Sequence, residues 1–350
     1  MSKKHQATRP HSQSLPSAAV KGMTTHLQIN TNTLVGLLDL GPARSLIDSI
    51  EQKRQGSRLL CIVYNDRGPL PAMLTPSALN PLAAILSRTG KMSSLDVFLR
   101  STGGITEVPW RIVTLLREFS DRLSIIVPSI ALSGATHLAI AGDELIMTPF
   151  SVLGSVDPTR NHSLLPKDAI GKPIPTSVED LKHCIKFIRE QLEESYQEQD
   201  LALIISELFK YINPLAIGAL EQSYNLSKLI TRKCLTTRKE PLTEEKINKI
   251  VDQLAGGYFS HSFLISRAEV EKDLGLPVTR PDAELTELIS RLENHYVERF
   301  GKEPQPLPAP NSQLLVRLGG VIQVADNGWA IAQIIKQDGQ PVVDPWIPFS

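Results

Sequence analysis

Four short apolar segments, each of a length typical of a β-strand, constrain the fold of this chain more than any other feature. They are residues 59–64, 95–99, 123–128 and 144–147. Helical patterns lie between them, at residues 76–87, 106–119 and 133–142. Strands that are apolar on both faces are typical of a parallel sheet that helices cover on both sides. The sequence therefore predicts an α/β fold with a parallel sheet and flanking helices.

Two glycine-containing turns follow the second and third of these strands. The first is Gly103-Gly104, and the second is Ser133-Gly134, which begins a helix of small residues. At a strand-to-helix turn the backbone N–H groups are unpaired and the helix dipole favours negative charge. A Gly-Gly turn can bring further N–H groups to the same point. Together these features would stabilise an oxyanion beside a serine nucleophile, so they predict acyl transfer, most simply peptide hydrolysis.

Composition narrows the function classes. The 37 Lys and Arg residues balance 37 Asp and Glu residues, which gives no argument for nucleic acid or an anionic membrane as a partner. Cys61, Cys184 and Cys234 include no CxxC pair, which suits a reducing cytosol and argues against a disulfide framework or a zinc site. No apolar run approaches the ~18 residues of a membrane span. We expect a cytoplasmic protein that uses no metal ion or cofactor.

A nucleophilic serine needs a base, and the sequence leaves several candidates open. His137 lies one helical turn after Ser133, but its apolar neighbours are more typical of a histidine in the core. Asp157 precedes a proline, where a carboxylate often serves a turn, and Ser133 itself could be only a helix N-cap. The other candidates are His162, His183 and His261, with Lys172, Lys182 and Lys186 for a Ser–Lys pair.

Changes in composition suggest four parts. Residues 1–24 have no hydrophobic period and are expected to be a disordered tail, and residues 25–300 to be the main domain. Residues 301–312 are expected to be a Pro-rich linker, and residues 313–350, with alternating apolar and polar residues, a small β appendage. The helices after residue 177 look amphipathic beyond the needs of one sheet face, so we expect a homo-oligomer.

Four segments resemble the Clp protease/crotonase superfamily. They are Arg-Ser-Thr-Gly-Gly (100–104), Ala-Leu-Ser-Gly-Ala-Thr (131–136), Ala-Gly-Asp-Glu-Leu-Ile-Met (141–147) and Ser-Val-Leu-Gly-Ser-Val-Asp-Pro (151–158). Within that superfamily, the chain is most similar to the serine dehydrogenase proteinase family, whose members are serine peptidases by relationship. The resemblance implies a Clp protease/crotonase-like fold. It also implies a soluble, oligomeric serine peptidase that acts on peptides or unfolded protein, with an unfoldase or other partner left unidentified.

The same resemblance suggests roles for individual residues. It implies that Ser133 is the nucleophile and that backbone N–H groups of Gly103 and Gly134 form the oxyanion hole. At the position of the Clp histidine this chain has Val156, followed by Asp157, and the position of the Clp aspartate falls near His261. The family is credited with a triad in the order Ser, Asp, His. Ser133, Asp157 and His261 fit that order, with Asp157 inferred from its position alone.

Two alternatives remain at this point. A crotonase-like enzyme would use the same paired N–H groups on an acyl-CoA thioester, but such a turn needs no nucleophilic serine and the sequence has no convincing CoA signature. A non-catalytic scaffold or partner-binding subunit is the other alternative, because the base is uncertain.

Overall fold

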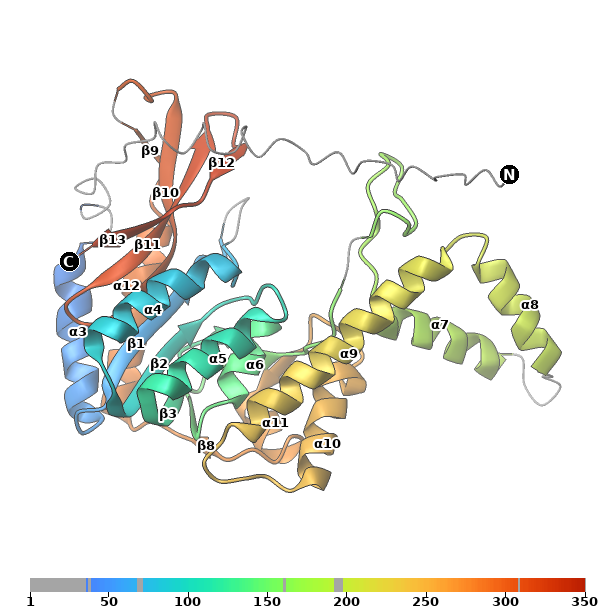
Figure 1. Ribbon diagram of the computed structural model, residues 1–350, viewed down its shortest axis with the longest axis horizontal. Coiled ribbons are helices and arrows are strands. Elements are labelled where there is room, and N and C mark those ends of the chain that lie inside the picture. Colours follow the sequence, from blue (N-terminus) through green and yellow to red (C-terminus); the bar gives the residue numbers. More distant parts are fainter. Residues whose placement is uncertain are drawn as a thin grey trace, which may run out of the picture.

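The computed structural model describes residues 36, 39–67, 72–159, 162–191, 198–307 and 309–349. The segment expected to be a disordered tail, residues 1–24, lies outside them. The described strands form a large sheet in the order β12-β11-β10-β1-β2-β3-β5-β8 and a three-stranded sheet in the order β4-β6-β7. Figure 1 shows the large sheet at the centre of the molecule.

Five strands of the large sheet run parallel to one another, which confirms the predicted fold class. They are β1 (Arg58–Tyr64), β2 (Met92–Arg100), β3 (Ser120–Val127), β5 (Glu144–Met147) and β8 (Val278–Thr279). In β1 the residues Leu60 and Ile62 enter one hydrophobic cluster, while Leu59 and Cys61 enter another on the opposite face. The strand is apolar throughout because both of its faces are buried.

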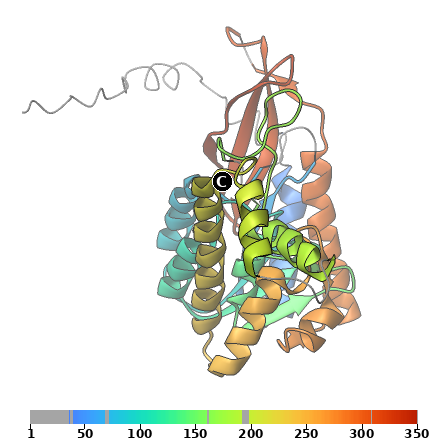
Figure 2. The same ribbon diagram turned by 90° about the vertical axis from the view of Figure 1, so that its right-hand side faces the viewer.

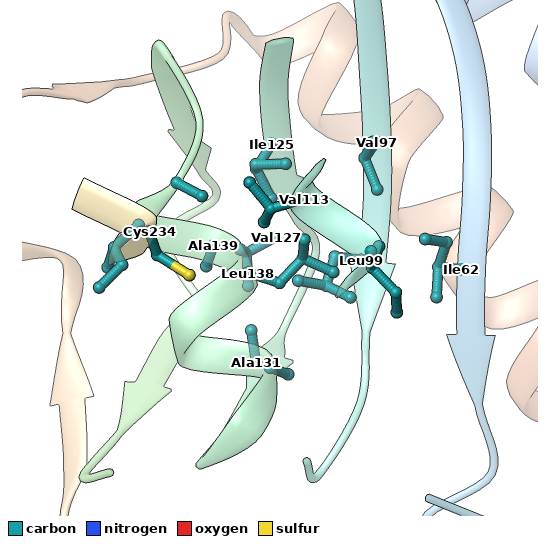
Figure 3. Packing of buried hydrophobic residues seen from close by; sticks show 14 of the residues in the cluster. Ile62, Val97, Leu99, Val113, Ile125, Val127, Ala131, Leu138, Ala139 and Cys234 are labelled. Atoms are coloured by element: carbon teal, nitrogen blue, oxygen red, sulfur yellow. The ribbon is translucent and has the colours of Figure 1, made fainter. Parts of the chain in front are cut away.

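Helices cover both faces of this sheet (Figures 1 and 2). One face is covered by α4 (Leu79–Thr89), after the short turn η1 (Pro76–Ala78), and by α5 (Val108–Phe119), α6 (Gly134–Ile140), α9 (Pro214–Thr236) and α10 (Glu244–Asp252). The other face is covered by α3 (Leu40–Lys53) and α12 (Ala283–Phe300). Figure 3 shows Leu138 and Ala139 of α6 packed between the sheet and Cys234 of α9.

The predicted C-terminal strands are present, but they extend the main sheet instead of forming a sheet of their own. They are β9 (Gln305–Pro306), β10 (Leu314–Gln323), β11 (Gly328–Lys336), β12 (Pro341–Val343) and β13 (Trp346–Phe349). Strand β10 pairs antiparallel with β1, from Cys61 opposite Gln323 to Tyr64 opposite Gly320. The polar residues of these strands do not mark a solvated face, because Gln323 and Gln333 are themselves buried.

Three smaller elements lie beside the sheet near its carboxyl-terminal edge. They are β4 (Ile130–Ala131), β6 (Val152–Gly154) and β7 (Leu264–Ser266), which is followed by α11 (Arg267–Lys272). Helices α7 (Val178–Gln191) and α8 (Glu198–Leu208) project away from the sheet as an arm (Figure 1). Within the described residues no helix is both long and apolar enough to cross a membrane.

Candidate active site

Ser133 has a strained backbone conformation at the start of α6. Its φ is 49° and its ψ is −119°, a combination that costs free energy for any residue with a Cβ. Ser133 occupies the N-cap position, but its side chain makes no capping hydrogen bond. The interpretation of Ser133 as an ordinary N-cap is therefore wrong, because its hydroxyl group does not bind the helix N–H groups that a cap would bind.

Neighbouring segments hold this conformation in place. The N–H of Leu132 donates to the carbonyl oxygen of Ser101 at 3.0 Å, and the hydroxyl of Thr136 bonds to the carbonyl oxygen of Ala131 at 2.8 Å. A Cβ on Gly154 would lie only 3.2 Å from the Cα of Leu132, so β6 is pressed against the residue before the serine. Strained residues persist where the surroundings determine them in this way, and they cluster at functional sites.

The Gly103-Gly104 turn is packed directly against Ser133, as the sequence predicted. A Cβ on Gly103 would lie 2.9 Å from the Ser133 Cβ and 2.9 Å from the Gly134 nitrogen. A Cβ on Gly104 would lie 2.1 Å from the carbonyl oxygen of Leu74, and one on Gly134 would lie 3.2 Å from the Gly104 nitrogen. Only glycine fits at positions 103 and 104, where a Cβ would meet backbone atoms at less than 3.0 Å. The turn after β2 and the serine after β3 lie at the carboxyl ends of these strands, where ligands of parallel sheets bind.

Hydrogen bonding distinguishes the N–H groups of this turn. The N–H of Gly103 donates to the Ser101 hydroxyl oxygen at 3.0 Å, so it is occupied. Among the described residues, the N–H groups of Gly104 and Gly134 have no acceptor. Gly104 and Gly134 are in close contact with each other beside Ser133. The Gly103 N–H that the family resemblance suggested is therefore engaged, whereas the N–H groups of Gly104 and Gly134 are available to an oxyanion.

Replacing Gly103 by alanine should reduce hydrolysis by a factor of about 100 or more, because a Cβ would displace the N–H groups beside Ser133. Gly90→Ala is the matched control. Gly90 also has a positive φ, 79°, but no atom lies within 4 Å of its added Cβ. The control should lose some stability and keep its turnover per folded molecule. Equal turnover in both variants would contradict the proposed importance of this turn.

His137 is a neutral histidine in the core. Its Nε2 lies 3.0 Å from the Thr231 hydroxyl and 3.4 Å from the Ser227 hydroxyl, and burial lowers its pKa to about 4. It makes no hydrogen bond to Ser133 within the described chain. His137 is therefore unsuited to act as the base, in agreement with the sequence analysis.

Asp157 lies in a buried position beyond the end of β6. Burial raises its pKa from 3.8 to about 7, against a hydrogen bond with Ser177, and the carboxylates of Glu179 and Asp180 raise it further. Its Oδ1 atom is buried and has no hydrogen-bond partner among the described residues. An unpartnered buried carboxylate oxygen is costly unless a donor approaches it at some stage of the protein's function.

His261 lies in an exposed loop between η3 (Gln253–Gly257), which is a π-helical turn, and β7. It makes no hydrogen bond to Ser133 or Asp157 in the part of the chain that the structure describes. The structure therefore brings Ser133 together with the glycine turns, but it does not bring His261 into contact with them.

The lysines proposed for a Ser–Lys pair are engaged elsewhere or exposed. Lys182 contacts Glu179 at 2.8 Å and lies 4.0 Å above the Tyr224 ring, and these partners raise its pKa against the effect of burial. Lys186 lies 3.7 Å from Glu190, and Lys172 is in an exposed loop. A base needs a free lone pair near neutral pH, so Lys182 is a poor candidate.

The sequence analysis missed Ser101, whose carbonyl oxygen binds Leu132 and whose hydroxyl binds Gly103. It also missed Leu74, whose N–H donates to the carbonyl oxygen of Gly103 at 2.8 Å. The pattern Ser-Thr-Gly-Gly did place a hydroxyl two residues before the turn, where side chains often cap such turns. Nothing in the local sequence indicated Leu74, because the contact joins distant segments.

Comparison with known proteins shows what this chain is similar to. Residues 79–176 match the family described as ClpP-like SDH-type serine proteinase. Two uncharacterized proteins of Methanocaldococcus jannaschii are similar to the chain. MJ1495 is 22% identical over 276 residues, which cover 76% of this chain and 81% of that protein. MJ0137 is 26% identical over 220 residues, which cover 62% of this chain and 65% of that protein.

Among solved structures, a ClpP1 mutant from Listeria monocytogenes matches 67% of this chain and 99% of its own, with 10% identity and a TM-score of 0.34. The family match includes both glycine turns, Ser133 and Asp157, and it ends before His261. Through residues 79–176, the chain is similar to the ClpP-like SDH-type serine proteinase family.

Proposed function

We propose that this protein is a serine peptidase that hydrolyses peptides or unfolded protein in the cytoplasm. The observation that carries the proposal is the strained, uncapped Ser133 beside the N–H groups of Gly104 and Gly134, which have no acceptor within the described part of the chain. The nucleophile would attack a peptide carbonyl, and the two N–H groups would bind the oxyanion that forms. A fluorophosphonate probe tests this: it should label Ser133, whereas a crotonase-like enzyme or a non-catalytic scaffold should remain unlabelled.

Asp157 and His261 are the proposed orienting carboxylate and base. Strand β6 pairs antiparallel with β7, with Gly154 opposite Leu264. The same register, continued three residues further, would bring Asp157 opposite His261. The carbonyl oxygen of Leu254 accepts hydrogen bonds from Ser155 and Val156, which ties the segment before Asp157 to the turn before His261.

We expect the hydrogen bonds that join His261 to Ser133 and Asp157 to form when substrate binds. Catalytic hydrogen bonds are often long or absent before substrate binds and tighten in the complex. The buried, unpartnered Oδ1 of Asp157 is an acceptor suited to the Nδ1–H of an imidazole. His261 stands in an exposed loop, where a rearrangement on substrate binding would disturb no core packing.

Asp157 should give hydrolysis and stability opposite dependences on pH. Its ionised form is needed to orient an imidazole, so turnover should fall as the pH falls through about 7. Its raised pKa means that the folded protein retains a proton that the unfolded chain has lost. The penalty for ionising it is absent below pH 4, grows between pH 4 and 7, and is complete above pH 7.

Asp157→Asn removes this penalty. It should be more stable than the native protein at pH 8, by an amount on the order of 2–4 kcal/mol, and equally stable near pH 4. Its turnover should be lower, but less so than that of a variant without the base, because Asp157 only orients it. Denaturant unfolding and peptide turnover across this pH range measure both effects. A native-like stability profile in Asp157→Asn would show that the carboxyl group is not buried as described.

We also propose that the protein is a homo-oligomer whose contacts come mainly from the helices of residues 177–255. Large apolar side chains on and after the α7–α8 arm are between 46% and 76% exposed: Phe187, Leu203, Phe209, Tyr211 and Leu215. Exposed apolar surface of this kind marks interaction sites. Light scattering at micromolar concentration should give an oligomer, and Phe187→Glu combined with Leu203→Glu should dissociate it. A monomeric mass for the native protein would overturn the proposal.

A further inference from the structure

Arg100, at the end of β2, makes three contacts with two other segments, the end of β1 and helix α12. Its Nε donates to Glu293 of α12 at 2.9 Å, its Nη1 to the carbonyl oxygen of Tyr64 at 3.1 Å, and its Nη2 to Asp66 at 3.0 Å. Its side chain is only 6% exposed. The planar guanidinium group presents its donors in a fixed geometry, so one side chain sets the relative positions of all three partners.

Glu293 extends the network to the strand that leads to the nucleophile. Its Oε1 atom also accepts a hydrogen bond from Ser129, in the segment that connects β3 to β4. The ends of β1, β2 and β3 are therefore joined to α12 through Arg100 and Glu293. A buried ion pair is weak evidence for stability by itself, and a role in fixing geometry explains it better.

The next residue, Ser101, is bonded both to the segment that carries Ser133 and to the glycine turn, so it links the position of Arg100 to both. Its carbonyl oxygen accepts from Leu132, the residue before Ser133, at 3.0 Å. Its hydroxyl oxygen accepts from the N–H of Gly103 at 3.0 Å. A displacement of the end of β2 would therefore move the glycine turn and the serine relative to each other.

We propose that Arg100 is a positioning residue that sets the distance between the oxyanion N–H groups and Ser133, a role that rests on the proposed hydrolase function. Arg100 contacts neither the Ser133 side chain nor the oxyanion N–H groups, and it acts through Ser101. Catalysis is sensitive to such geometry, since a misplacement of about 1 Å can cost a factor of about 100 in rate.

The same sheet contains a matched control. Arg54, near the amino-terminal edge, also joins two carboxylates, with its Nε 2.7 Å from Asp96 and its Nη2 2.7 Å from Glu144. It is a partly buried arginine in a comparable ion-pair network, but it lies at the opposite edge of the sheet from Ser133. A general loss of sheet stability should affect both variants equally, whereas a loss of site geometry should affect only the Arg100 variant.

The test compares Arg100→Lys, Glu293→Gln and Arg54→Lys in the full chain. Lysine keeps the charge but cannot reach three partners at once. Arg100→Lys and Glu293→Gln should lower kcat and the rate of fluorophosphonate labelling of Ser133 by about tenfold or more, with little change in KM. Arg54→Lys should lower the melting temperature by a similar amount and leave kcat unchanged. A loss of kcat in Arg54→Lys as large as in Arg100→Lys would overturn the proposal, and so would unchanged kcat in Arg100→Lys.

Hydrogen exchange separates this proposal from the proposed function. In Arg100→Lys the amides of Gly103 and Leu132 should exchange about tenfold faster, while amides in the middle of β2 keep their protection. This result needs no catalytic activity. If Ser133 proves not to be a nucleophile, faster exchange at these amides would still show that Arg100 positions the turn. Unchanged exchange would refute that role even in an active peptidase. If Arg100→Lys does not fold, Glu293→Gln carries the same measurement.

Discussion

Ser133→Ala should abolish peptide hydrolysis, with a loss of about 10⁴-fold or more in kcat, and should leave the stability of the fold nearly unchanged. The first effect follows from removal of the nucleophile, since only the weak catalysis of the oxyanion hole would remain. The second follows from the structure. Loss of an N-cap side chain usually costs ~1 kcal/mol, but the Ser133 hydroxyl caps nothing. Turnover of a fluorogenic peptide and denaturant unfolding measure the two effects.

Ser133→Gly adds a sharper test of the strained conformation. Glycine adopts positive φ without the penalty that a Cβ brings, so this inactive variant should be more stable than the native protein by about 1 kcal/mol. Gln55→Gly is the matched control, because Gln55 also has a positive φ, 57°, at the end of a helix far from the site. It should gain stability and keep full turnover. Hydrolysis that persists in purified Ser133→Ala would end the assignment of Ser133 as nucleophile.

His261→Gln should reduce kcat by orders of magnitude, because the serine would lose the group that accepts its proton. Glutamine keeps similar size and polarity but cannot exchange a proton near neutral pH. Since His261 is exposed, the variant should unfold at the same denaturant concentration as the native protein. Measured kcat and the unfolding midpoint together distinguish a loss of chemistry from a loss of fold.

His137→Gln is the informative comparison for that experiment. His137 is buried and bonded to Thr231, so its replacement should lower stability through packing and reduce activity only as far as the fold suffers. Native turnover in His261→Gln would remove His261 as the base. Loss of turnover in Lys172→Met or Lys186→Met would then favour a Ser–Lys pair.

The local sequence was sufficient to predict the strands and the helix that carry the candidate site. The apolar segments 95–99 and 123–128 became β2 and β3, and the small-residue segment from Ser133 became the start of α6. These elements are predictable because burial on both faces and helix initiation depend on neighbouring residues. The Gly103-Gly104 turn was predictable for a similar reason, since its backbone conformation needs glycine.

The features of the fold and of the candidate site that the local sequence did not predict depend on contacts between distant segments. The strands after residue 313 join the main sheet because β10 pairs with β1, some 250 residues earlier in the chain. The position of the Gly103-Gly104 turn against Ser133 depends on such contacts, because the turn is also bonded to Leu74, about 30 residues earlier in the chain. The proposed pairing of His261 with Asp157 would likewise depend on a long-range contact, because strands β6 and β7 join the two loops that carry these residues. The sequence by itself determined the parallel sheet and the glycine turns beside a serine, because short-range burial and backbone conformation specify them. The tertiary structure alone decided that Ser133 is strained and uncapped and that the glycine turn packs against it, because those properties arise from packing between segments far apart in the chain.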